Sequence, residues 1–265
     1  MNDIQNIIYL HHSTGGVIWQ GRKASIVTRA AKKVSPKLAG IVGKKALIPS
    51  LFDKYNKENN KNNLIKEMVF QKASPYGWHN YPYDYYHIWV KNAGNEPFME
   101  EPTLEMLTKQ NQVIIFKHCL PVSNIKSDKD TADINSDYRS LANYKLQYAA
   151  LKEKLNEFPG TKFILFTGAA LVKSAVKEDE AKRAQEFFRW VTSEWDLPGD
   201  NIHIWDLYSL ETGGSLYFKQ EYASSQGDSH PNGEFAAKAA KLLFNRIIDV
   251  IERDGMGTKP TGEKL

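Results

Sequence analysis

The chain is poor in cysteine, since Cys119 is the only one among its 265 residues. An internal disulfide is therefore excluded, and cysteine usage does not indicate a redox compartment. No apolar run reaches the roughly 18 residues of a membrane-spanning helix, so we expect no membrane span. The first residues lack the basic and long apolar regions of a signal peptide. Two alternatives stay open: a cytoplasmic protein, or a secreted or periplasmic one whose signal has been removed.

Strong charge of one sign is also missing. The net charge is only +4, the lysines are scattered and no arginine-rich stripe occurs, so we expect no nucleic-acid partner. Gly15-Gly16 lacks the rest of a phosphate-loop or dinucleotide-binding motif, and we predict no cofactor. The oligomeric state is left open by the sequence.

Apolar segments of two kinds alternate along the chain. Short runs predict strands, and longer stretches with helical spacing predict helices of 15 to 20 residues. This alternation is typical of βαβ units, and it predicts an α/β fold with a parallel sheet covered on both faces. The expected strands are 4–10, 113–116, 162–167 and 202–206, and the expected helices are 138–157, 178–195 and 233–252.

We expect one domain over residues 1–255. The apolar fraction of 42% is enough for a sizeable core, and no linker marks a domain boundary. Residues 20–63 are basic and then rich in Lys and Asn, and we interpret residues 20–75 as a surface insertion with one or two helices. Residues 256–265 are expected to form a flexible tail.

Ser13 stands where the first expected strand breaks into polar residues and glycines, in His11-His12-Ser13-Thr14-Gly15-Gly16. A serine at the carboxyl edge of a sheet, followed by a tight turn, can act as a nucleophile beside backbone amides that face an oxyanion. The alternative is that Ser13 or Thr14 caps a helix beginning near Gly16. The two interpretations are compatible.

His230 lies just before the last expected helix, in Gly227-Asp228-Ser229-His230-Pro231-Asn232. His-Pro-Asn could be a simple turn, with Pro starting the helix and Asn232 capping it. Alternatively His230 is a general base, and Asp228 orients its imidazole. The loops of a parallel α/β sheet gather at its carboxyl edge, which can bring Ser13 and His230 together.

In combination, these two ends resemble the SGNH (GDSL-like) hydrolase family. The order of the motifs carries the resemblance from residue 4 to about 250, most weakly over 20–75. The landmarks are Ser13 after the first strand, Ile204-Trp205-Asp206-Leu207-Tyr208, Leu216-Tyr217-Phe218, and Asp228-Ser229-His230-Pro231-Asn232 before an Ala-rich helix. The resemblance implies a three-layer α/β/α flavodoxin-like fold, and a serine hydrolase that uses Ser13 and His230.

Departures from the family leave the remaining site residues open. The Gly-Asp-Ser-Leu box is replaced by His11-His12-Ser13-Thr14, and Asp228 is one residue closer to the histidine than in the family's Asp-x-x-His pattern. Asp228 is our choice of acid, with Asp206 or a Ser-His dyad as alternatives.

The family's oxyanion hole implies three donors here. They are the Ser13 amide, the Gly94 amide in an Asn-Ala-Gly-Asn stretch, and the Asn124 side chain, for which Lys117 or His118 could substitute. Gly94 has the alternative of an ordinary turn.

The segment 75–89 is dense in Tyr and Trp, which either bind a sugar or bury area under a loop. We name Trp78 and His12 as candidate substrate-binding residues. A metal site of His11, His12 and His230 has no supporting ligand spacing, so we predict no metal.

The sequence thus predicts a serine esterase or acylhydrolase that forms an acyl-enzyme. A saccharide or small-molecule ester, O-acetyl above all, is the expected substrate. The alternative is a non-catalytic carbohydrate-binding module on the same fold.

Overall fold

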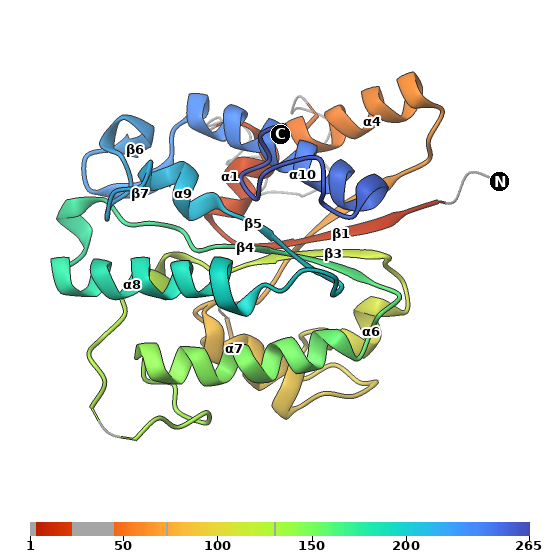
Figure 1. Cartoon of the computed structure of the whole chain (residues 1–265). Coiled ribbons are helices and arrows are strands. Elements are labelled where there is room, and N and C mark those ends of the chain that lie inside the picture. Colours follow the sequence, from red (N-terminus) through yellow and green to blue (C-terminus); the bar gives the residue numbers. More distant parts are fainter. Residues whose placement is uncertain (1–3, 23–44, 73, 130) are drawn as a thin grey trace.

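The structure is a computed structural model, and it describes residues 4–22, 45–72, 74–129 and 131–265. Most of the first half of the expected 20–75 insertion therefore lies outside the described residues. The rest of the chain folds as one layered α/β unit (Figure 1).

A five-stranded sheet forms the centre, in the order β2-β1-β3-β4-β5, and every neighbouring pair is parallel. The three middle strands are almost wholly buried, as the apolar runs predict for strands covered on both faces. The strands are β1 (Asn6–His11), β2 (Leu64–Val69), β3 (Val113–Lys117), β4 (Lys162–Phe166) and β5 (Ile202–Trp205). The α/β class and the parallel sheet are thereby confirmed.

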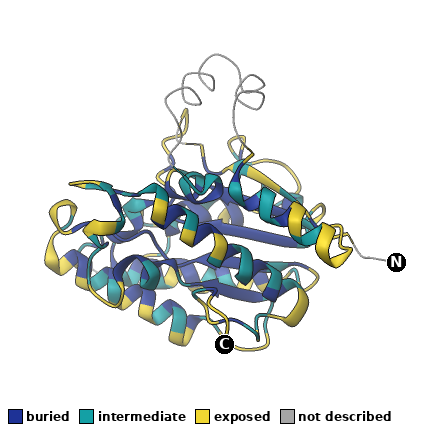
Figure 2. Cartoon of the chain, turned by 90° about the horizontal axis from the view of Figure 1, so that it is seen from above, coloured by how far each residue is buried: buried dark blue, intermediate teal, exposed yellow. Residues whose placement is uncertain are grey.

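Helices cover both faces of the sheet, as Figures 1 and 2 show. One layer holds α1 (Thr14–Gln20), α4 (Leu47–Asn59) and α10 (Gly233–Arg253), which contact one another. The opposite layer holds α6 (Leu104–Thr108), α7 (Leu141–Asn156) and α8 (Glu178–Trp190). Helix α8 continues as a π-helix over Val191–Trp195. The arrangement is consistent with a three-layer α/β/α fold.

Shorter elements complete the fold. They are α5 (Pro82–Tyr85), a π-helix over Tyr86–Lys91, 3-10 turns over Leu120–Ser123, Lys173–Ala175 and Gln220–Tyr222, α9 (Leu207–Thr212), and an antiparallel hairpin of β6 (Ala223–Ser225) and β7 (Asp228–Pro231). In Figure 1 this hairpin lies at the same end of the molecule as the start of α1.

Strand β2 corrects the sequence interpretation of residues 20–75. Its six residues, Leu-Ile-Lys-Glu-Met-Val, pair with β1 and form the edge of the central sheet, so the segment is not only a surface insertion. The strand was missed because an edge strand keeps much of its side-chain area in solvent. Leu64 and Val69 are both about half exposed, and the polar residues between them hide the pattern.

The last residues are also a correction, because 256–265 pack against the sheet instead of forming a flexible tail. The indole of Trp205 donates to the carbonyl of Thr261, and the amide of Asp206 donates to that of Pro260. Thr258 is buried and donates to Asp249 of α10. Short polar sequences of this kind carry no periodicity from which such packing could be predicted.

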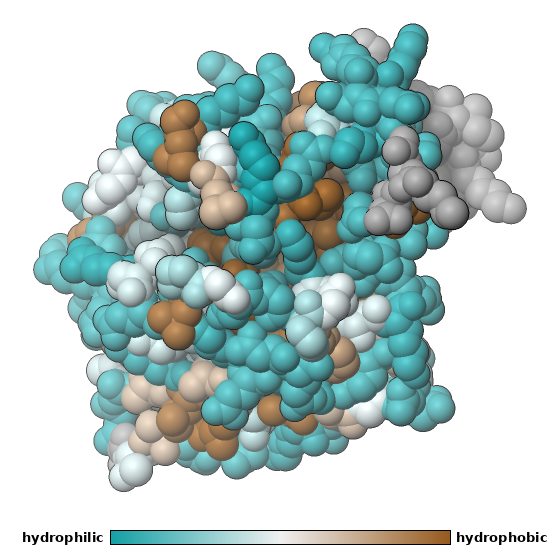
Figure 3. All heavy atoms as spheres, turned by 45° about the vertical axis from the view of Figure 1, so that its right-hand side comes forward, coloured by the Kyte–Doolittle hydropathy of each residue, from teal (hydrophilic) through white to brown (hydrophobic). Residues whose placement is uncertain are grey.

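The molecular surface is mostly hydrophilic on the face in Figure 3, where apolar side chains occur in small separate groups. Among the helices of the described residues, none combines the length and the apolar character needed to cross a membrane.

Candidate active site

Ser13 occupies a sharp turn between β1 and α1. Its backbone has φ 44° and ψ −108°, an unfavourable conformation for a residue with a side chain. A hydrogen bond from β1 stabilises the turn, because the Tyr9 hydroxyl donates to the carbonyl of Gly15 over 3.0 Å. Ser13 is at the N-cap position of α1 but makes no capping hydrogen bond with its side chain. Its exposed Oγ is therefore available for another partner.

Gly15 makes this turn possible. A Cβ placed on it would stand 2.6 Å from Cβ of His11 and 2.7 Å from Cδ of Lys117. Both distances are shorter than real Cβ contacts, so only glycine lets the first turn of α1 pack this closely on the ends of β1 and β3.

His230 lies on β7 and not on the last helix. The residues that follow it begin α10, because the side chain of Asn232 accepts a hydrogen bond from the amide of Phe235 and caps that helix. The sequence interpretation of Asn232 as a cap is confirmed. Strand β7 contacts α1, and this contact places His230 over the turn that holds Ser13.

Three side chains form a continuous hydrogen-bonded chain. Oγ of Ser13 is hydrogen-bonded to Nε2 of His230, and Nδ1 of His230 lies 2.6 Å from Oδ1 of Asp228. An ionised carboxylate can only accept, so Nδ1 carries the proton and Nε2 is the acceptor for the Ser13 hydroxyl. This is the arrangement in which an imidazole can remove a proton from serine.

Asp228 remains ionised in this setting. Burial acts to raise its pKa, but hydrogen bonds from the Ser224 hydroxyl and from the amide and ring of His230 outweigh it, and the pKa falls to about 2. The carboxylate also holds the backbone of His230, whose amide donates to Oδ1 over 2.9 Å. The shorter spacing to the histidine, compared with the family pattern, therefore still allows direct contact.

Asp206, the alternative acid, has hydrogen-bond partners other than His230. It caps α9 by accepting from the amide of Ser209, and its Oδ1 also accepts from the Thr167 hydroxyl over 2.7 Å. Among the described residues, Asp228 is the carboxylate that contacts His230.

A pocket of about 230 Å³ opens beside Ser13. His12 and Trp78, the two residues that the sequence singles out for substrate binding, both line it. The remaining lining residues are Gln71, His79, Asn80, Cys119, Leu120 and Pro121.

Sequence reasoning missed two of these residues that flank Ser13 in the sheet. The register pairs His11 with Val69 and Tyr9 with Ile115. Continued past the strand ends, it sets Ser13 between Gln71 on one side and Cys119 on the other. Recognising 64–69 as a strand would have found Gln71, because it follows that strand as Ser13 follows β1.

Lys117 lies beneath the turn and is fully buried. Its Nζ donates to the carbonyl of His12 over 3.1 Å and to Sγ of Cys119 over 3.3 Å. Burial acts to raise the pKa of the Cys119 thiol, but the Lys117 charge and a hydrogen bond from His12 outweigh it, and the pKa is lowered. A thiol with a lowered pKa therefore lines the pocket, and Nζ of the buried Lys117 lies against it.

Two of the expected oxyanion donors point elsewhere. The amide of Gly94 donates to Oε2 of Glu105 over 3.1 Å, and Gly94 follows a π-helix instead of the second strand. The side chain of Asn124 donates to Oε2 of Glu180 over 3.3 Å. Neither residue lines the Ser13 pocket, so we correct both assignments. The Ser13 amide, the third expected donor, stays a prediction.

His118 and Lys117, the alternatives to Asn124 as oxyanion donors, lie in different places. His118 turns away from Ser13 and is hydrogen-bonded, through Nε2, to the hydroxyl of Tyr148. Lys117 reaches the carbonyl of His12, directly before the serine. Lys117 thus supports the turn from inside the molecule.

The histidines proposed for a metal site have other partners. His11 is buried, and its Nε2 lies 2.9 Å from Oε2 of Glu67. His230 is engaged by Asp228 and Ser13. Over the part of the chain that the structure describes, no group of three or more His, Cys, Asp or Glu side chains is arranged to hold a metal ion.

The aromatic residues of segment 75–89 differ in position: most are buried in the core, and Trp78 lines the pocket. Tyr85 and Trp89 are fully buried and pack against Phe70 and Phe116 of the core. Trp78 instead lines the Ser13 pocket. Most of the segment therefore buries apolar area, and one of its rings faces the site.

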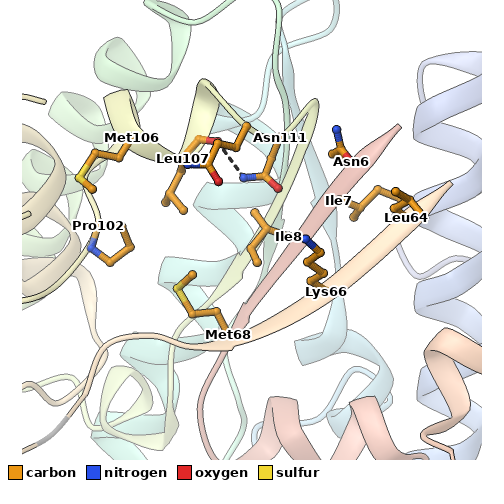
Figure 4. A pocket seen from close by; sticks show the side chains of 11 residues that line it. Asn6, Ile7, Ile8, Leu64, Lys66, Met68, Pro102, Met106, Leu107 and Asn111 are labelled. Atoms are coloured by element: carbon orange, nitrogen blue, oxygen red, sulfur yellow. Dashed lines mark hydrogen bonds between the residues drawn. The ribbon is translucent and has the colours of Figure 1, made fainter. Parts of the chain in front are cut away.

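A second, larger hollow of about 470 Å³ lies between β1, β2 and α6 (Figure 4). Figure 4 shows apolar side chains such as Ile8, Met68 and Met106 around it, together with Lys66. It includes Asn6 and Leu64, which begin their strands, so it belongs to the opposite end of the sheet from Ser13.

Comparison with known proteins gave no match to a family model, to a curated protein or to a solved structure.

Proposed function

We propose that the protein is a serine hydrolase that cleaves carboxylic esters through an acyl-enzyme. The observation that supports this most is the chain of hydrogen bonds from Ser13 through His230 to Asp228. A binding module has no need of such a chain, nor of a serine held at φ 44°. The resemblance of the sequence to SGNH hydrolases points the same way, and the flavodoxin-like SGNH fold is part of the proposal.

The reaction would proceed in two halves. Oγ of Ser13 attacks the ester carbonyl while Nε2 of His230 takes its proton, and Asp228 stabilises the resulting imidazolium. The tetrahedral intermediate collapses as His230 returns the proton to the leaving alcohol, which gives the acyl-enzyme. Water then attacks the acyl carbon, His230 accepts the water proton and passes it to Oγ, and the carboxylic acid leaves.

The pocket favours a small acyl group and a polar alcohol. Its volume of about 230 Å³ is below the usual range for drug-sized ligands. Trp78 and Asn80 line it, and their Nε1 and Oδ1 atoms have no hydrogen-bond partner within the described chain, so we infer that they meet hydroxyl groups of the substrate. An O-acetyl ester of a sugar combines these two requirements.

Hydrolysis of p-nitrophenyl acetate, followed by release of acetate from acetylated sugars, tests the proposal. Wild type should turn over, whereas Ser13→Ala and His230→Ala, with unchanged circular dichroism, should lose at least about 1,000-fold in kcat. Absence of turnover of every ester by the folded wild type, or full activity of Ser13→Ala, would contradict it.

A further inference from the structure

Gln71 has an unusual environment for a buried amide. Only 1% of the residue is exposed, yet neither Nε2 nor Oε1 finds a hydrogen-bond partner in the described part of the chain. An unpaired buried amide costs stability, and such groups are rare in folded proteins. Since no described residue meets this amide, we look for its partner in a molecule bound in the pocket.

The position of Gln71 indicates what that partner is. The residue lines the pocket that Ser13 lines, and it follows β2 as Ser13 follows β1. The amide of Phe70, directly before it, donates to the carbonyl of His11 over 3.0 Å, which ties the two strand ends together. Gln71 is thus held on a backbone that is fixed relative to the serine turn.

The proposed hydrolase also has no side-chain donor assigned to its oxyanion so far. Asn124, expected from the sequence for that role, donates to Glu180 outside the pocket. An oxyanion must be met by donors that are already in place when charge develops on the carbonyl oxygen. Gln71 lines the pocket of the nucleophile, and its Nε2 is a donor without a partner in the described part of the chain.

We propose that Gln71 is a catalytic residue whose Nε2 donates a hydrogen bond to the carbonyl oxygen of the substrate as it becomes an oxyanion. This inference rests on the proposed hydrolase function and adds the donor that the serine triad by itself does not provide. The amide of glutamine both donates and accepts. Nε2 can therefore donate to the oxyanion while Oε1 accepts from an alcohol hydroxyl of the substrate.

The test substitutes Gln71 by Met, of similar length and without polar atoms, and by Glu, of the same shape but without the amide hydrogens. With p-nitrophenyl acetate, we expect kcat to fall about 100-fold in both variants while KM changes less than about threefold. We also expect the melting temperature of Gln71→Met to be equal to or above that of wild type, since its apolar side chain removes an unpaired buried amide. A glutamine that only supported the fold would give a lower one.

Gln147→Met is the matched control. Gln147 is equally buried, lies in α7, and donates through Nε2 to the carbonyls of Ile134 and Ser136. This variant should melt at a lower temperature and keep its kcat.

The outcomes separate the two proposals. If folded wild type hydrolyses no ester, the proposed hydrolase function itself is contradicted. If wild type is active, then a folded Gln71→Met or Gln71→Glu with kcat within about threefold of wild type overturns the role of Gln71 alone. A rise in KM without a fall in kcat also overturns it, because the amide would then bind substrate and transition state equally. If Gln71→Met does not fold, Gln71→Glu decides.

Discussion

Ser13 and His230 are 217 residues apart in the sequence and are joined by a hydrogen bond between Oγ and Nε2. Two features of the fold produce this contact. Ser13 is the second residue after β1, which ends at His11, and His230 lies on a hairpin strand that packs against α1. The proposed chemistry depends on this pairing.

Asp228→Asn should lower kcat by on the order of 10³ to 10⁴ with little change in structure. An amide can donate to Nδ1, so it no longer fixes the tautomer in which Nε2 accepts from Ser13. Steady-state kinetics with p-nitrophenyl acetate measure the loss. Ser224→Ala is the milder companion: it removes one hydrogen bond to the carboxylate and should cost about tenfold or less. Equal activity of Asp228→Asn and wild type would show that Asp228 has no orienting role.

Gly15→Ala should disrupt the serine turn. The new Cβ would stand 2.6 Å from Cβ of His11 and 2.7 Å from Cδ of Lys117, so the strand end and α1 must separate. We expect a loss of about 1–3 kcal/mol in the free energy of unfolding. Activity should fall at least about tenfold. Gly16→Ala is the control: its nearest contact is 3.3 Å, to the ring of His11, and it should change both quantities little. Urea unfolding and kcat/KM distinguish the two variants.

Cys119 offers a way to block the pocket chemically. Its lowered thiol pKa favours reaction with methyl methanethiosulfonate, which would place an S-methyl group in the pocket beside Ser13. We expect wild type to lose activity and to regain it with dithiothreitol. Cys119→Ser should keep most of its activity and resist the reagent. Inactivation of Cys119→Ser at the rate of wild type would rule this site out.

Glu211 should make stability depend on pH. Burial raises its pKa to about 8, although the amide of Ala170 and the Lys117 charge act in the opposite direction. A carboxyl group with a raised folded-state pKa contributes stability that is complete below its unfolded pKa, near 4.5, and is lost as pH rises through about 8.

Glu211→Gln isolates this contribution. The difference in unfolding free energy between wild type and Glu211→Gln should shift against wild type as pH rises from 5 to 9. Denaturant titrations across that range measure it. A difference that stays constant with pH would contradict the expectation.

The sequence predicts the middle of the sheet and the pairing of Ser13 with His230, but not the surroundings of that pair. Strands β1, β3, β4 and β5 are buried on both faces, so unbroken apolar runs reveal them. Ser13 and His230 stand next to such strong elements, at the end of β1 and the start of α10. Ser13 and His230 themselves could therefore be placed by counting along the chain from these elements.

The polar edge of the fold could not be predicted in this way. Strand β2 lies at the edge, and its mixed sequence concealed both the strand and Gln71 after it. Gly94 and Asn124 were assigned by their order along the chain, but order does not determine which acceptor an amide meets. Glu105 and Glu180, which hold them, come from α6 and α8 on the far layer.

Reaction with a fluorophosphonate, followed by intact-mass measurement of wild type, Ser13→Ala and His230→Ala, tests the central claim most directly. The reagent phosphonylates a serine hydroxyl only where a neighbouring base activates it. We expect one adduct on wild type, none on Ser13→Ala and strongly slowed labelling of His230→Ala. No adduct on the folded wild type, or an adduct that persists on Ser13→Ala, would contradict it.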